Sequence, residues 1–142
     1  MKKLLMLFLI VNVFAVFAEE MDVAVDMDVV VEIDVVETTI VDYESMDQVS
    51  ALAKDKPTVL FFKASWCPSC ISAAKNFESK VDELKDINLV VVNYDESKEL
   101  QKLYGVTYQH TFVQVNENEE ALAKWNGGST KKLLNNIVKG DM

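Results

Sequence analysis

Cys67 and Cys70 are the only cysteines of the chain, and two residues separate them. An apolar run over residues 58–62 leads into the pair, and a helical pattern of apolar residues leaves it, so the pair is predicted to lie where a buried strand ends and a helix begins. A helix N-terminus carries partial positive charge and unpaired N–H groups, which lower the pKa of a thiol there below about 8.5. Because the second thiol can reach the first, the pair has the parts needed for thiol–disulfide exchange.

The motif Trp-Cys-x-x-Cys at residues 66–70, between a buried strand and an amphipathic helix, resembles the thioredoxin superfamily. The resemblance covers roughly residues 36–142 and implies an α/β, thioredoxin-like fold, with a central mixed β-sheet flanked by α-helices. It also implies that Cys67 is the attacking, more exposed thiol and Cys70 the resolving one. Further matching segments fall at similar spacings: Asn93-Tyr94-Asp95, Tyr104-Gly105-Val106, Gln109-His110-Thr111-Phe112-Val113 and Gly127-Gly128.

The residues around the two cysteines belong to the predicted site environment. Trp66 is expected to pack beside the thiols and to shape a docking surface. Pro68 costs little in a first helical turn, because its missing N–H would be unpaired there. Thioredoxins usually carry Gly-Pro between the cysteines, whereas Pro68-Ser69 is more similar to glutaredoxins. Because these residues tune the redox potential, a thioredoxin value cannot be transferred to this chain.

One departure from the family concerns its buried acid–base pair. Thioredoxins carry an aspartate six residues before the first cysteine, which helps to deprotonate the second, and often a companion lysine on the next strand. Phe61 and Val91 occupy these two places. The resolving step has therefore lost its usual base. Lys63 is a candidate electrostatic replacement; the alternative is a solvated lysine at the strand end.

A second departure concerns the only histidine. The residue before Thr111 is a proline in the cis form in the family, facing the cysteines, and here it is His110. A cis bond before a residue other than proline costs about 2.5–4 kcal/mol, so we expect a trans Gln109–His110 bond with local rearrangement. The imidazole would stabilise the Cys67 thiolate, shuttle a proton or ligate a metal. The alternative is a loop histidine that points away.

Other readings of the cysteines are less favoured. One alternative is that the two cysteines are buried structural thiols. A structural zinc site needs four ligands, and two cysteines with one histidine do not supply them. We therefore expect no metal and no cofactor, although loss of the proline leaves a metal or iron–sulfur role open.

Charge is unevenly distributed over the 142 residues, which carry a net charge of −9 and suggest one domain. Residues 48–142 are neutral and there is no arginine, so no basic patch predicts nucleic-acid binding. Residues 19–47 hold no lysine and a run of acids: Glu19, Glu20, Asp22, Asp26, Asp28, Glu32, Asp34, Glu37, Asp42, Glu44 and Asp47.

Residues 1–18 are predicted to be a secretory signal peptide. Lys2 and Lys3 form a basic start, residues 4–17 are apolar, and residues 16–18 offer small side chains for cleavage before Glu19. The alternative is a membrane tether, for which the apolar stretch is short. Export of this bacterial type predicts a periplasmic or secreted protein, in a compartment where disulfides form.

Residues 19–35 alternate acidic residues with Val and Met, which has the period of a strand. Clustered negative charges also repel one another and remain solvated. We interpret the segment as an acidic Asp/Val-rich linker; the alternative is an extra edge strand or a docking segment for a partner. Residues 36–142 form the thioredoxin-like domain.

Within that domain, residues 35–41 are predicted to form the first strand, and Ser45 to cap a short helix. Later elements are a strand over 87–94, a helix after Ser97 that ends at Gly105, an antiparallel hairpin over 111–125, and a last helix after Ser129. Residues expected to face the core are Ala73, Ala74, Phe77, Val81, Leu84, Leu100, Leu103, Tyr104, Trp125, Leu133, Leu134, Ile137 and Val138.

These observations favour an exported thiol–disulfide oxidoreductase that uses the Cys67–Cys70 pair. Reduction of protein disulfides is the preferred direction, because the domain lacks the helical insertion that the oxidase branch of the family carries. Its partners would be protein thiols and disulfides and an unidentified electron donor or acceptor, and we expect a monomer. The alternative is a non-catalytic or metal-binding module that holds a protein partner near Trp66 and His110.

Overall fold

The computed structural model describes residues 39–139 of the chain. The predicted signal peptide, the acidic segment and the start of the predicted first strand lie outside these residues. In the part that is described, no helix combines the length and the apolar character that a membrane crossing requires.

A five-stranded mixed sheet forms the centre, in the order β1-β3-β2-β4-β5. The parallel strands are β1 (Ile40–Asp42), β3 (Asn88–Asn93) and β2 (Thr58–Lys63). Antiparallel to β2 runs β4 (Thr111–Val115), and β5 (Ala121–Asn126) completes the predicted hairpin. This mixed sheet confirms the predicted fold class, and it places the carboxyl ends of β2 and β3 side by side.

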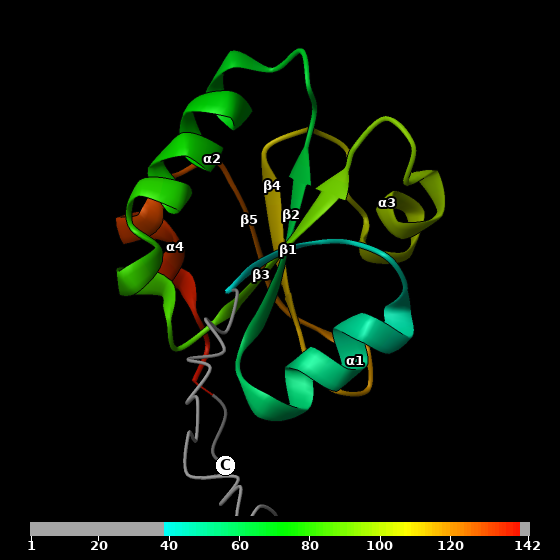
Figure 1. Cartoon of the computed structure of the whole chain (residues 1–142). Helices are drawn as coiled ribbons and strands as arrows, with labels where there is room; N and C mark the ends of the chain where they lie inside the picture. Colours follow the sequence, from blue (N-terminus) through cyan, green and yellow to red (C-terminus); the bar gives the residue numbers. More distant parts are fainter. Residues whose placement is uncertain (1–38, 140–142) are drawn as a thin grey trace, which may run out of the picture. The chain divides into compact units, whose positions relative to one another are not determined.

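Helices cover both faces of the sheet (Figure 1). On one face lie α2 (Pro68–Ser79) and α4 (Thr130–Asn136), and on the other lie α1 (Met46–Asp55) and α3 (Lys98–Tyr104). Side chains alternate along β2, and all but the last residue of β2 are buried, as expected for a strand covered on both faces. Two apolar clusters result, one beneath α2 and α4 and one beneath α1 and α3.

The helix boundaries follow local chemistry. The Ser45 hydroxyl accepts a hydrogen bond from the Gln48 N–H and caps α1, as predicted. Gly105 ends α3 with a φ of +61°, in the left-handed region that glycine enters without a steric penalty. Ser97 and Ser129 occupy N-cap positions, but their side chains make no capping hydrogen bond.

Three predicted core positions are wrong. The helix α2 ends at Ser79 and the chain tightens into a 3-10 turn, η1 (Val81–Leu84), which buries Leu84 but turns Val81 towards solvent. In α3 only Leu100 and Tyr104, four residues apart, reach the sheet, and Leu103 is exposed. Val138 follows the end of α4 in extended backbone and exposes its side chain.

Candidate active site

The two cysteines lie at the start of α2, immediately after the carboxyl end of β2. Cys67 is the N-cap residue, and its sulfur accepts a hydrogen bond from the Cys70 N–H at 3.2 Å. Pro68 occupies the first turn, and the Cys67 N–H donates to the Ala64 carbonyl at 3.3 Å, which closes the turn from strand to helix. The predicted strand–helix placement of the pair is therefore confirmed. Both cysteines are free thiols.

The surroundings of the two thiols push their pKa values apart. Burial raises the pKa of Cys67, but hydrogen bonds from Cys70 and Ser69 outweigh it, and the pKa lies below its ordinary value. Burial, the hydrogen bond with Cys67 and the charge of Cys67 raise the pKa of Cys70 to about 11. Cys67 is 3% exposed and Cys70 is 0% exposed. Cys67 is thus the thiol that ionises more readily and lies nearer to solvent.

Ser69 and His110 lie together beside Cys67, although they are 41 positions apart in the sequence. The Ser69 hydroxyl is 3.2 Å from the Cys67 sulfur and 3.0 Å from Nδ1 of His110. Nε2 of His110 lies 3.3 Å from the Gly128 carbonyl oxygen. The imidazole therefore faces the thiol site, and the alternative of a histidine that points away is wrong.

The backbone fixes the position of this imidazole. Every described peptide bond is trans, including the bond before His110, and His110 has a φ of +58°. Its N–H donates to the Phe62 carbonyl at 2.8 Å, and its carbonyl accepts from the Gly127 N–H at 2.7 Å. The expected trans bond with local rearrangement is confirmed: the loop turns through the left-handed region, which histidine enters more readily than most residues.

Apolar rings and a lysine surround the His110 side chain. Its ring centre lies 5.8 Å from that of Phe61 and 5.7 Å from that of Phe112. Burial is the largest influence on the pKa of His110 and lowers it. The hydrogen bond to Gly128 raises this pKa, the positive charge of Lys132 lowers it, and the net shift is downward. The imidazole is therefore held mainly neutral at neutral pH.

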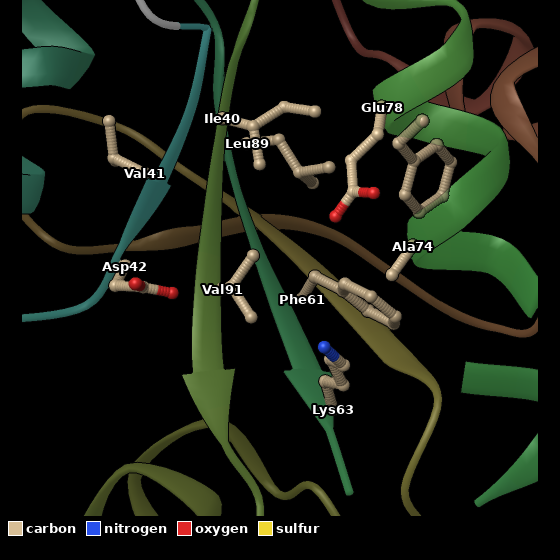
Figure 2. Close-up of a pocket in the computed structure, with 10 residues that line it drawn as sticks. Ile40, Val41, Asp42, Phe61, Lys63, Ala74, Glu78, Leu89 and Val91 are labelled. Carbon is tan, nitrogen blue, oxygen red and sulfur yellow. The ribbon is translucent and has the colours of Figure 1, made fainter. Parts of the chain in front are cut away.

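The place of the family's acid–base pair is filled by packed side chains and a cavity. Phe61 stacks on Phe112 with ring centres 4.6 Å apart and meets Phe77 edge-on at 5.6 Å. A cavity of about 300 Å³ lies between β1, β3, β2 and α2. Figure 2 shows Phe61 and Val91 among the residues that line it. Neither residue supplies a proton acceptor to Cys70.

Lys63 lines the same cavity. Figure 2 shows Lys63 and Glu78 pointing into it from the end of β2 and from α2. The groups that lower the pKa of Cys67 are Cys70 and Ser69, and Lys63 is not one of them. Its role as an electrostatic replacement stays a prediction.

Trp66 lies at the surface of the site and is 59% exposed. Its Nε1–H donates to Oδ2 of Asp95 at 2.9 Å, which ties it to the loop after β3. Tyr108 is 70% exposed in the loop before β4. Sequence reasoning did not assign a role to Asp95 or Tyr108. The signal for Asp95 was available, because residues that follow neighbouring parallel strands meet at one edge of the sheet.

Thr111 supports the loop instead of facing the thiols. Its hydroxyl donates to the Tyr108 carbonyl at 2.6 Å and accepts from the Asn126 side-chain amide at 3.1 Å. The side chain is buried at the start of β4. Thr111 therefore holds the segment that carries His110.

A metal would need converging ligands. Within residues 39–139, no three His, Cys, Asp or Glu side chains gather closely enough to hold an ion. Nδ1 of His110 lies within hydrogen-bond distance of the Ser69 hydroxyl, and Nε2 lies within hydrogen-bond distance of the Gly128 carbonyl oxygen.

This fold, with a dithiol at the strand-to-helix junction, defines a thioredoxin-fold protein. The sequence model of the Thioredoxin family matches residues 34–140. The chain therefore belongs to the thioredoxin family. Thioredoxins act on protein disulfides, and membership supports disulfide oxidoreductase activity as the general class of this chain.

Individual relatives agree with this assignment. Thioredoxin H5 of Oryza sativa subsp. japonica is 34% identical over 98 residues, covering 68% of this chain and 72% of the rice protein. Thioredoxin-1 of Drosophila melanogaster is 34% identical over 94 residues, covering 61% of this chain and 81% of the fly protein. The crystal structure of a Trypanosoma brucei brucei thioredoxin aligns with a TM-score of 0.59 at 23% identity, covering 70% of this chain and 88% of that chain, and supports the fold alone.

Proposed function

We propose that the chain is an exported thiol–disulfide oxidoreductase that reduces protein disulfides. Cys67 attacks a substrate disulfide, a mixed disulfide forms, and Cys70 displaces the substrate thiol while the Cys67–Cys70 disulfide closes. Two electrons pass from the dithiol to the substrate, and a separate donor restores the dithiol. The chain works as a monomer.

One observation carries this proposal: the two thiols are unequal in the way that the two steps require. Cys67 has a lowered pKa and its sulfur receives the Cys70 N–H at the start of α2. Cys70 is fully buried with a pKa near 11. The attacking position therefore holds the thiol that ionises more readily, and the second thiol stays protonated until it is needed.

Export rests on residues 1–18 alone, whose basic start, apolar stretch and small-residue end are those of a secretory signal. Expression of the full chain followed by N-terminal sequencing of the exported form tests it. A mature protein that begins at Glu19 supports export, and an uncleaved protein that stays in the cytoplasm contradicts it.

Equilibration with glutathione buffers, followed by thiol trapping, tests the activity and its direction. A potential near that of thioredoxin, about −270 mV, supports a reductase, and one near about −120 mV makes the chain an oxidant. A pair that does not cycle between dithiol and disulfide contradicts the proposal and leaves the module that only holds a partner.

Substitution of each cysteine assigns the two roles. Cys70→Ser should form a stable mixed disulfide with a peptide disulfide, and Cys67→Ser should form almost none, because a serine hydroxyl is not ionised and the remaining thiol is buried. Equal trapping by both variants would contradict the assigned order.

A further inference from the structure

The Ser69 hydroxyl contacts both Cys67 and the His110 side chain, at 3.2 Å from the sulfur and 3.0 Å from Nδ1. The far ring nitrogen, Nε2, faces the Gly128 carbonyl at 3.3 Å. Four groups from the start of α2, the loop before β4 and the turn after β5 thus form one hydrogen-bonded series: thiol, hydroxyl, imidazole and carbonyl.

The number of hydrogens on each group fixes which group donates and which accepts along this series. A carbonyl oxygen only accepts, so Nε2 must carry the hydrogen that points at Gly128. In a neutral imidazole Nδ1 is then an acceptor, and it takes its hydrogen bond from the Ser69 O–H. Because the Ser69 O–H is already donated to His110, the Ser69 oxygen accepts the hydrogen bond in its contact with Cys67. The hydrogen of that contact comes from the Cys67 S–H.

We propose that Ser69 and His110 form a proton relay that deprotonates Cys67 through the Ser69 hydroxyl. The Cys67 S–H bond breaks as a Ser69 O–H bond forms, while the original Ser69 O–H bond breaks and an Nδ1–H bond forms on His110. The products are a thiolate, an unchanged serine and an imidazolium, so charge and protons balance and no electron moves. The inference rests on the proposed function, in which Cys67 must become a thiolate.

The surroundings of His110 favour a base that receives the proton briefly. The apolar rings of Phe61 on β2 and Phe112 on β4 disfavour a lasting charge, and Lys132 on α4 repels one. On α2 the neighbours are Cys67, Cys70 and Ser69, and the first turn of α2 contains no acidic residue. The Gly128 carbonyl and the new thiolate are the two groups that stabilise an imidazolium here.

The geometry is already assembled before any substrate binds. The loop that carries His110 is pinned to β2 by the bond from its N–H to Phe62, and to the glycine turn by the bond from Gly127. Ser69 is fixed by its place in the first turn of α2. A relay needs this kind of fixed contact, because each transfer requires a hydrogen bond that is in place.

The pH dependence of Cys67 alkylation tests the relay. The full chain is reduced and treated with iodoacetamide between pH 5 and pH 10, and peptide mass spectrometry measures the adduct on Cys67. The variants are Ser69→Ala, which removes the bridge, and His110→Asn, which keeps a polar side chain that tolerates the positive φ but accepts no proton. Ser72→Ala, an exposed serine of the same helix, is the matched control.

We expect Ser69→Ala and His110→Asn to slow alkylation at pH 7 by roughly 100-fold, the lower end of what a positioned base contributes. The double variant should be no slower than either single variant, because the two residues act as one unit. At pH 10 all variants should converge, since the thiolate then forms without a base. Rates that match those of Ser72→Ala at pH 7, or losses of equal size at every pH, would overturn the relay.

The single histidine gives a second measurement that does not depend on reaction rates. Its ring nitrogens have one set of NMR signals, which should show the Nε2–H form in the neutral state. A neutral ring protonated at Nδ1 would overturn the relay, because Nδ1 could then accept nothing.

Parallel assays separate failure of the relay from failure of the proposed function. Reduction of a peptide disulfide at unchanged rates in both variants would leave the function standing and overturn the relay. The expected alkylation profile in a chain that reduces no disulfide would support the relay and contradict the proposed function.

Discussion

The two sides of the dithiol differ in how they handle protons. On the side of the sheet interior, where the family carries an acid–base pair, Phe61 and Val91 supply only apolar surface next to a cavity. On the side of the loop before β4, where the family carries an inert proline, His110 presents an imidazole to Ser69 at 3.0 Å. The basic group has in effect moved from the neighbourhood of Cys70 to that of Cys67.

This difference has opposite consequences for the two steps of the proposed reaction. Attack by Cys67 gains a nearby base, and the pKa of the Cys67 thiol lies below its ordinary value. Resolution by Cys70 has lost its usual base, and the pKa of Cys70 is near 11. We therefore expect a fast first step and a slow second step. A long-lived mixed disulfide would also serve a module that holds a protein partner. The oxidoreductase hypothesis and the partner-binding hypothesis therefore both predict this property.

The largest expected effect tests the interior side. Phe61→Ala should lower the free energy of unfolding by about 3–5 kcal/mol, because it removes a fully buried ring that stacks on Phe112 and meets Phe77. Urea denaturation measures the loss. Phe61→Leu, which keeps most of the volume, is the control and should cost less. Because the Phe61 ring also lies 5.8 Å from that of His110, its loss should weaken the burial that lowers the pKa of His110, and NMR titration of the single histidine should show an upward shift.

A smaller effect tests the loop side. His110→Pro restores the family residue, but proline requires a φ near −65° and lacks the N–H that His110 donates to Phe62. The substitution should therefore destabilise the protein by at least about 1 kcal/mol, whereas His110→Asn should cost less. Thermal unfolding of the two variants measures the difference. A proline variant as stable as the original chain would mean that this loop does not require the left-handed conformation.

The smallest expected effect concerns the charge next to the imidazole. Because the Lys132 ammonium lowers the pKa of His110, Lys132→Gln should raise that pKa slightly. NMR titration of the single histidine measures the shift. Lys131→Gln, an exposed neighbour on the same helix, is the control and should leave the pKa unchanged. The shift should shrink at high salt, and a downward shift would contradict the electrostatic account.

Much of the fold could be predicted from the sequence, because strand and helix periodicity is a local property. The unbroken apolar run of β2 and the capping serine of α1 were sufficient to place both elements. Val81 was placed wrongly because apolar spacing alone does not fix where α2 ends, and Leu103 because apolar spacing does not show which side of α3 faces the sheet.

The candidate site was predicted in part. Cys67, Cys70 and His110 were identified from the motif and from the family position of the histidine. The bridging role of Ser69 could not be predicted, because it depends on a contact across 41 residues and on the positive φ of His110. The order of the parallel strands could have placed Trp66 and Asp95 at one edge of the sheet, but the hydrogen bond between them needed the structure.

The most direct test of the central claim measures the two steps of exchange separately. The reduced chain is mixed with a peptide disulfide, the reaction is quenched with acid, and mass spectrometry counts the mixed disulfide and the closed Cys67–Cys70 disulfide. We predict that the mixed disulfide accumulates at pH 7. Because the pKa of Cys70 is raised to about 11, its thiolate fraction grows with pH, and resolution should speed up steadily from pH 7 towards that value. Resolution that outpaces attack at pH 7 and does not change with pH would contradict the account.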